Sequence, residues 1–129
     1  MSLVLLDTTL LIDAERTESD LDEVIRDEDD VAIAAITVAE LLVGVELATE
    51  KHRVARAGYV EEVITSIPVI PYDTVVAVEH AHLLAAVKQA GRPRGAHDLL
   101  IAATARATGR VVVTRDKRAF ADLPGVGVN

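Results

Sequence analysis

The sequence predicts an α/β protein in which helices wrap a mostly parallel sheet. Short apolar runs alternate with helical patterns along all 129 residues, as in successive β-α-β units. The first run, residues 3–6, is apolar throughout and is followed at once by Asp7, which is typical of a buried parallel strand that ends at a site. Half of the residues are hydrophobic and 26% are charged, a globular composition. We expect one domain over residues 1–129.

Further strands are predicted where short apolar runs recur. Pro68 and Pro71 bracket one of these runs, which favours an edge strand or a strand end, because proline has no N–H to donate to a neighbouring strand. The predicted strands after the first cover residues 31–34, 67–71 and 111–113, with a last edge strand at 126–128.

Helical patterns fill the intervals between these strands. Thr37 and Glu40 have the spacing of a capping box, so a helix is expected to begin there. Asp73 is expected to cap a long helix, and Gly109 to end the last one. An apolar stripe at Leu21, Val24 and Ile25 precedes an acidic loop at 27–30. The predicted helices cover residues 8–14, 36–48, 54–64, 74–90 and 97–108.

The composition excludes several kinds of chemistry. The chain has no cysteine, so it has no disulfide, no thiolate zinc site and no cysteine nucleophile. No apolar run is long enough for a membrane span, and the apolar start is too short for a signal peptide. We therefore expect a soluble cytoplasmic protein. The surplus of aliphatic residues indicates that a partner covers some surface, or that a buried parallel sheet uses it.

Charge is distributed unevenly along the chain. The net charge is −8, and residues 1–40 hold 12 of the 21 acids. Residues 86–129 hold eight basic residues against three acids, so this segment is locally positive. Such asymmetry marks either a polyanion-binding edge on an acidic protein or ordinary solvated helix faces.

Four carboxylates recur at the predicted ends and beginnings of elements. Asp7 ends the first strand, Glu40 opens the helix after the second, Asp98 opens a buried helix, and Asp116 follows the fourth strand. In open parallel sheets, ligands gather beyond the carboxyl ends of the strands. Taken singly, each acid is explained as a helix cap or a first-turn acid. Four acids at one rim would repel one another unless a cation neutralises them, and an all-carboxylate set suits Mg²⁺ or Mn²⁺.

Basic residues flank two of these acids in sequence. A metal held by carboxylates polarises a phosphodiester and activates a bound water, while bare carboxylates would repel the nucleic-acid backbone. Acids together with nearby bases are therefore what a metal-dependent nuclease requires. The candidate residues for binding the nucleic-acid backbone are Arg92, Arg94, Arg115, Lys117 and Arg118.

With these residues identified, the chain resembles a PIN-domain ribonuclease, specifically a VapC-type toxin of a toxin–antitoxin pair. The resemblance covers nearly the full length. It rests on four segments in this order: LDTT at 6–9 with LID at 11–13, TVAEL at 37–41 with Gly44, HDLLIAA at 97–103, and VTRD at 113–116 with Phe120 and the turn at 124–125.

The resemblance implies a three-layer α/β/α fold with four to five strands and a metal-dependent endoribonuclease. It implies that Asp7 and Asp98 are the main Mg²⁺ ligands, that Glu40 binds through water or orients the attacking water, and that Asp116 completes the site. Many relatives read Thr-x-Asn-x-x-Asp-Phe after the fourth strand. Here Asp116 stands at the Asn position and Ala119 at the Asp position, so the fourth acid stands one turn earlier than in those relatives.

Supporting roles and partners follow from the same resemblance. Thr8 and Thr114 are expected to support the metal or a phosphate, or to act as caps. Asp13 is expected to be a solvated acid and His97 a plain helix-start residue. The family implies an RNA substrate, a VapB-type antitoxin that covers the groove near the acids and offers them an Arg or Lys, and a homodimer. The alternative is a catalytically silent PIN-like module that binds proteins. A phosphatase or receiver domain is disfavoured, because Thr8 and Thr9 follow Asp7 where those proteins carry acids.

Overall fold

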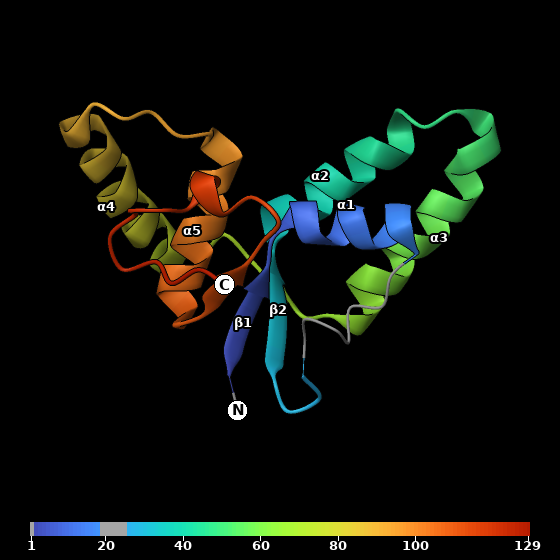
Figure 1. Cartoon of the computed structure of the whole chain (residues 1–129), viewed down its shortest axis with the longest axis horizontal. Coiled ribbons are helices and arrows are strands. Elements are labelled where there is room, and N and C mark those ends of the chain that lie inside the picture. The colour runs from blue at the N-terminus through green and yellow to red at the C-terminus, as the bar shows by residue number, and fades with distance from the viewer. Residues whose placement is uncertain (1, 19–25) are drawn as a thin grey trace.

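A computed structural model describes residues 2–18 and 26–129, and its centre is a parallel sheet (Figure 1). The sheet has four strands in the order β3-β2-β1-β4, and every neighbouring pair is parallel. The predicted α/β class and parallel sheet are confirmed. The strands are β1 (Leu3–Leu6), β2 (Asp30–Ala34), β3 (Val69–Ile70) and β4 (Val111–Val113).

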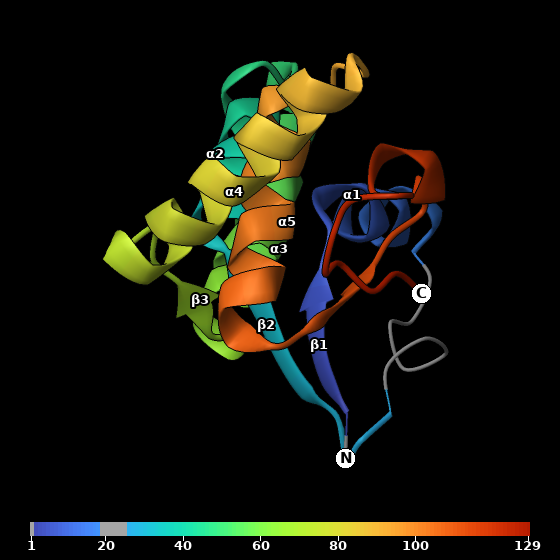
Figure 2. The ribbon, with the colours of Figure 1, turned by 90° about the vertical axis from the view of Figure 1, so that its left-hand side faces the viewer.

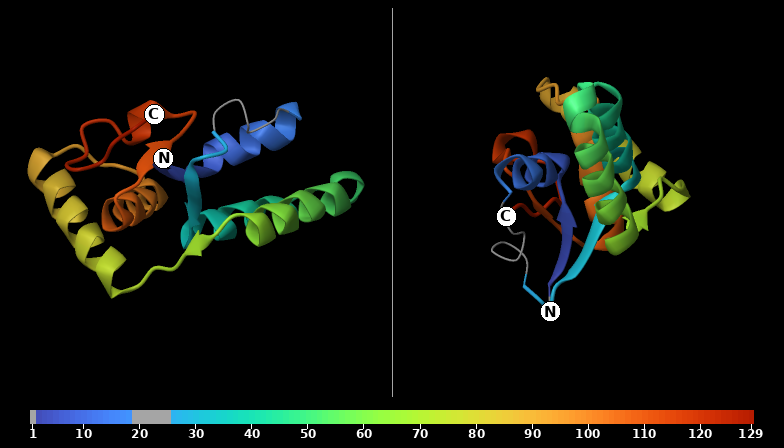
Figure 3. Two further views of the ribbon diagram at one scale, coloured as in Figure 1. Left: turned by 90° about the horizontal axis from the view of Figure 1, so that it is seen from below. Right: turned by 90° about the vertical axis from the view of Figure 1, so that its right-hand side faces the viewer.

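Helices cover both faces of this sheet, which makes three layers. In Figure 1, α4 and α5 lie on one side of the central strands, and α1, α2 and α3 lie on the other. The long pair α2 and α3 forms a hairpin that extends beyond the sheet (Figure 3). The helices are α1 (Thr8–Thr17), α2 (Ala35–Glu46), α3 (Glu50–Ser66), α4 (Thr74–Ala90) and α5 (Ala96–Thr108).

Residues of β1 alternate between two apolar cores. Val4 and Leu6 pack with residues of α1, α2 and α3, whereas Leu5 packs with residues of α4 and α5. Leu5 and Leu6 have no exposed surface at all. Since successive side chains of a strand point to opposite faces, a strand covered on both faces must be apolar at every position. This is why the first run of the sequence is uninterrupted up to Asp7.

The strand order fixes where a site can form. The chain moves outward from β1 to β2 and β3, and then returns across the sheet to place β4 on the other side of β1. The direction of winding therefore reverses between β1 and β4. Loops that leave two such strands diverge and open a crevice at their carboxyl ends. Figure 2 shows β1 rising from the amino terminus toward α1 at this end of the sheet.

Several predicted boundaries differ from the structure. The helix α1 continues to Thr17 and ends where Glu18 adopts a left-handed conformation, with a φ of 53°. The capping-box prediction is wrong, because α2 already begins at Ala35 and has no side-chain cap. The last edge strand is reduced to a single bridge between Val112 and Val128. The predicted stripe at 21, 24 and 25 lies outside the described residues.

Other predictions about the elements are confirmed. The Asp73 side chain caps α4 by accepting a hydrogen bond from the amide of Val76 at 3.0 Å. Gly109 ends α5 with a φ of 64°, a conformation that glycine adopts without strain. Among the described residues, none of the helices combines the length and the apolar character needed to cross a membrane.

Phe120 anchors the turn that follows β4. This turn contains a short 3-10 helix, η2 (Lys117–Ala119), and Phe120 comes directly after it. Phe120 is the only phenylalanine of the chain, and its side chain is completely buried in the core on the α4–α5 side. The turn that carries Asp116 is therefore held by one large apolar side chain.

Replacing Phe120 by alanine is expected to lower the free energy of unfolding by about 3–5 kcal/mol, because it removes a fully buried ring and leaves a cavity. Denaturant unfolding followed by circular dichroism measures this change. The matched control is Val54→Ala on the exposed face of α3, where the side chain is 83% exposed and the change should stay within about 0.5 kcal/mol. Equal effects of the two substitutions would contradict the anchoring role.

Candidate functional site

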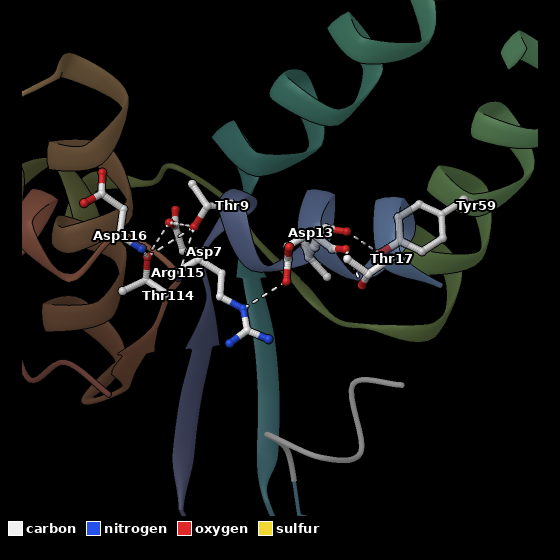
Figure 4. A network of polar contacts seen from close by, with 9 residues as sticks. Asp7, Thr9, Asp13, Thr17, Tyr59, Thr114, Arg115 and Asp116 are labelled. Carbon is white, nitrogen blue, oxygen red and sulfur yellow. Dashed lines mark hydrogen bonds and ion pairs between the residues drawn. The ribbon is translucent and has the colours of Figure 1, made fainter. Parts of the chain in front are cut away.

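Asp7 is held by two threonine hydroxyls at the carboxyl end of β1. Its side chain is 2% exposed, and its Oδ2 accepts hydrogen bonds from Thr9 Oγ1 at 2.6 Å and Thr114 Oγ1 at 2.7 Å (Figure 4). It makes no side-chain cap to α1, although it occupies the N-cap position. The helix-cap explanation of Asp7 therefore does not hold, and its carboxylate is oriented by one hydroxyl from α1 and one from the loop after β4.

The same two hydroxyls are fixed in turn by backbone amides. The amide of Arg115 donates to Thr9 Oγ1 at 3.2 Å, and the amide of Asp116 donates to Thr114 Oγ1 at 2.9 Å. Each hydroxyl thus accepts from the loop after β4 and donates to Asp7. In such chains each hydrogen bond polarises the next, and the two hydroxyls give the buried carboxylate the hydrogen bonds that water would otherwise supply.

Glu40 lies on α2 and reaches toward the starts of two other helices. Its Oε1 accepts a hydrogen bond from Thr8 Oγ1 at 2.7 Å, and its Oε2 lies 3.3 Å from Nδ1 of His97. Thr8 Oγ1 also bonds to Thr37 Oγ1 at 3.0 Å. The residues expected to form a capping box therefore connect α2 to α1 and α5.

Asp98 lies in the first turn of α5, partly buried, and folds back toward the loop before it. A Cβ atom on Gly95 would lie 2.9 Å from Asp98 Oδ2, so any side chain at position 95 would displace this carboxylate. Burial raises the pKa of Asp98, and the charges of Asp7, Glu40 and Asp116 raise it further, while His97 lowers it. The charges of the other three predicted acids therefore act on Asp98, and the effect is part of its raised pKa.

Asp116 is the most exposed of the four acids. It precedes η2 without a side-chain cap, so the loop-cap explanation does not hold for it. Its backbone amide donates a hydrogen bond to the Thr114 hydroxyl, which in turn donates to Asp7. Figure 4 shows Asp116 and Asp7 on either side of the Thr114 hydroxyl.

The donor chemistry of this site fits a hard divalent cation. The acids and the threonine hydroxyls are all oxygen donors, which Mg²⁺ and Mn²⁺ prefer, and carboxylates that raise the pKa of a neighbour gain from a cation between them. Within residues 2–18 and 26–129, no three acids or histidines come close enough to form a finished metal-binding cluster. The acids thus share an electrostatic environment without a closed coordination shell.

The predicted basic residues lie around the site, and three of them have internal partners. Arg94 donates to backbone carbonyls of the turn after β4, and Arg92 lies 4.0 Å from the carboxylate of Asp122. Arg115 donates from Nε to Asp13 Oδ2 at 3.1 Å, and both of these side chains are about half exposed (Figure 4). Asp13 is therefore part of an ion pair. Lys117 and Arg118 are exposed on η2.

Two residues of the network were not identified as functional in the sequence. Thr9 contributes one of the two hydroxyls that hold Asp7, and His97 bonds to Glu40. Thr9 stands two positions after Asp7, where a side chain can turn back to the strand end. His97 directly precedes Asp98. Their closeness in sequence to Asp7 and Asp98 was the only sign of a role at the site. Threonine and histidine also occur at helix starts for purely structural reasons, so this sign was not decisive.

Replacing Asp98 by asparagine is expected to stabilise the metal-free protein at neutral pH. Since the pKa of Asp98 is raised, its contribution to stability is present at acidic pH and is lost as the pH rises through the raised pKa. Asparagine cannot ionise, so the melting temperature of the variant in EDTA should exceed that of the wild type at neutral pH and converge with it at acidic pH.

Thermal unfolding of Asp27→Asn, at an exposed turn position, supplies the control for loss of one surface charge. An Asp98→Asn variant that melts at or below the wild-type temperature at neutral pH would contradict the repulsion among the acids.

Comparison with known proteins places this site in a family. The family model described as "PIN domain" matches residues 4–126. The chain is 34% identical to the tRNA(fMet)-specific endonuclease VapC of Salmonella typhimurium, over 76% of this chain and 73% of that protein. It is 33% identical to Toxin FitB of Neisseria gonorrhoeae, over 92% and 91%.

A solved structure agrees with these sequence matches. The DNA-bound VapBC of Salmonella typhimurium superposes with a TM-score of 0.86 at 28% identity and covers 100% of this chain and 98% of that one. The family match spans the positions of Asp7, Glu40, Asp98 and Asp116. The chain belongs to the PIN domain family and is of the VapC type.

Proposed function

We propose that this protein is a metal-dependent endoribonuclease that acts as the toxin of a toxin–antitoxin pair. The observation that carries the proposal is the convergence of Asp7, Glu40, Asp98 and Asp116 from four separate segments. Burial raises the pKa of Asp98, and the charges of the other three acids raise it further. Relatives named as VapC endonucleases support the reaction class. The carboxyl-end crevice between β1 and β4 is where parallel sheets bind ligands.

Asp7 and Asp98 would be the main ligands of Mg²⁺ or Mn²⁺, with Glu40 and Asp116 completing the site. When bound, the ion would polarise the phosphodiester and lower the pKa of a water bound to it. Asp7 is suited to its role because two hydroxyls fix its carboxylate before any ion arrives. Glu40, held at both oxygens by Thr8 and His97, is suited to orient the attacking water and to accept its proton.

Cationic side chains around the acids would hold the RNA backbone. Lys117 and Arg118 are exposed on η2, beside Asp116, and Arg92 is exposed in the loop before α5. Arg115 is oriented by Asp13 on α1. Because an acidic protein repels a polyanion at long range, a few cations at the site must provide the local attraction.

A VapB-type antitoxin is the proposed regulator. Relatives have been solved as VapBC and FitAB assemblies. A groove of about 260 Å³ runs between α1, α2 and α3 and reaches the acids at Glu40. Ile12 lines this groove and is 37% exposed. An apolar antitoxin segment in the groove would bring an Arg or Lys to the acids and compete with the metal and RNA.

A homodimer in the cytoplasm is proposed as the resting assembly. The region from β3 to α4 exposes apolar side chains, among them Tyr72, Val75 and Val78, each about half exposed. Tyr72 also lines an apolar hollow of about 370 Å³ beside α2 and α5. A second copy of the chain would cover this surface and account for part of the aliphatic surplus of the sequence.

Asp7→Asn and Asp98→Asn are each expected to abolish Mg²⁺- or Mn²⁺-dependent RNA cleavage. The loss should exceed the roughly 10–100-fold effect of losing a residue that merely supports a metal site. A cleavage time course on total RNA, with and without EDTA, measures it, and sequencing of the fragments identifies the cut. Asp27→Asn removes an acid from an exposed turn and should cleave at the wild-type rate.

The same experiment separates the nuclease from the second candidate, a catalytically silent protein-binding module. Cleavage that survives both Asp7→Asn and Asp98→Asn would come from a contaminant and would refute the nuclease assignment. A wild-type protein that cleaves no RNA but binds its antitoxin would favour the silent module.

Ile12→Glu is expected to weaken inhibition by the antitoxin by about tenfold or more, because a charge in an apolar contact costs at least the roughly 1.4 kcal/mol that a tenfold change represents. The antitoxin to test is the product of a small reading frame directly upstream. Inhibition is measured relative to the uninhibited cleavage by each variant. Leu47→Glu, at a side chain that is 80% exposed outside the groove, is the control. Equal inhibition of both variants would exclude this groove.

A further inference from the structure

Arg94 lies in the loop between α4 and α5 and makes several contacts with the turn after β4. Its guanidinium donates to the carbonyl oxygens of Ala119 at 3.1 Å and Ala121 at 2.6 Å, with a longer contact of 3.4 Å to that of Arg118. Arg94 is also less exposed than its neighbours Arg92 and Gly95. These contacts use three of the five N–H donors of the guanidinium and direct its Nη1 and Nη2 groups toward the backbone of the turn.

The contacts of Arg94 link the two segments that carry Asp98 and Asp116. On one side, Gly95 follows Arg94, N-caps α5 and leaves the space that the Asp98 carboxylate occupies. On the other side, the three carbonyls belong to η2 and the residues just after it, and Asp116 stands at the start of η2.

The backbone of the turn after β4, which Phe120 anchors by its side chain, has few hydrogen bonds to other described parts of the chain. Its own backbone hydrogen bonds are local, such as those from the amide of Ala119 to the carbonyl of Asp116 and from the amide of Phe120 to the carbonyl of Lys117. Carbonyls at the end of a short 3-10 helix lack partners within the helix and are satisfied from outside. Arg94 supplies the donors for these carbonyls from the loop that begins α5.

We propose that Arg94 is a positioning residue for the metal site, which fixes Asp116 relative to Asp98, and that it does not contact the RNA. This inference rests on the proposed metal-dependent function of the same acids. It divides the basic residues of the site into those that face the substrate and one that holds the acidic turn in place. The planar fork of donors is the property that matters, so lysine at position 94 cannot replace arginine even though it keeps the charge.

The test measures Mn²⁺ affinity of the purified protein by isothermal titration calorimetry, independently of cleavage. Arg94→Lys and Arg94→Ala should both lower Mn²⁺ affinity by about 10–100-fold, the usual effect of losing a residue that orients a ligand. Both should lower kcat more than they raise KM. Hydrogen exchange at the amides of residues 117–121 should be faster in both variants.

RNA binding is measured separately, without metal and in the inactive Asp7→Asn background. There, Arg94→Lys and Arg94→Ala should bind RNA as well as the parent protein does, whereas Arg92→Ala should bind more weakly and with a shallower salt dependence. Arg53→Ala removes another arginine that donates to a backbone carbonyl, that of Ala48 at 2.9 Å, away from the acids. It should leave Mn²⁺ affinity unchanged and so controls for general loosening.

Each of three outcomes would contradict one part of the proposal or the function on which it rests. Wild-type Mn²⁺ affinity in Arg94→Lys would overturn the positioning role while leaving the proposed function intact. Weakened metal-free RNA binding in Arg94→Ala, with a shallower salt dependence, would make Arg94 a substrate contact. A wild-type protein that binds no Mn²⁺ and cleaves no RNA would overturn the proposed function itself.

Discussion

Four carboxylates at one edge of a small sheet repel one another, and the structure around them has to compensate for this repulsion. A buried carboxylate is costly unless hydrogen bonds replace its lost water. Asp7 obtains them from the hydroxyls of Thr9 and Thr114, which the amides of Arg115 and Asp116 fix in turn. Asp98 has no such hydroxyl partners among the described residues, and burial together with the charges of the other three acids raises its pKa. The fold thus brings together charges that a divalent cation would stabilise.

The packing of the aliphatic core compensates for the repulsion among the four acids. Val4, Leu5 and Leu6 lead directly to Asp7, and their side chains pack alternately into the cores on the two faces of the sheet. A strand anchored on both faces fixes its last residue firmly. The return of the chain to β4 then sets Val113 beside Leu6, in register, so the loops after the two strands begin at neighbouring positions. Cohesion in the sheet therefore offsets repulsion at its edge.

Several arginines in the last third of the chain donate hydrogen bonds to backbone carbonyls of the protein itself. Arg106 donates to the carbonyl of Pro124 at 2.9 Å, and Arg110 donates to the carbonyls of Val4 and Asp30 at 3.2 and 2.6 Å. Arg94 has the same role in the turn after β4. Arg94 and Arg106 thus donate to carbonyls of irregular turns, whereas Arg110 donates to carbonyls of β1 and β2, and the guanidinium fork can reach more than one carbonyl at once. The local positive charge of this segment therefore overstates the surface available to a polyanion.

Apolar periodicity and strand-end acids are local patterns, so the α/β class, the buried parallel strands and the four candidate acids could be predicted from the sequence. The order of those patterns also indicated the family. Which groups each side chain contacts is visible only in the folded chain. Thr37 and Glu40 have capping-box spacing, yet they bond to Thr8, because α2 starts at Ala35 and packs near α1. Arg94 and Asp13 were ambiguous for the same reason: their partners, Ala121 and Arg115, are distant in sequence and come close only after the chain crosses the sheet.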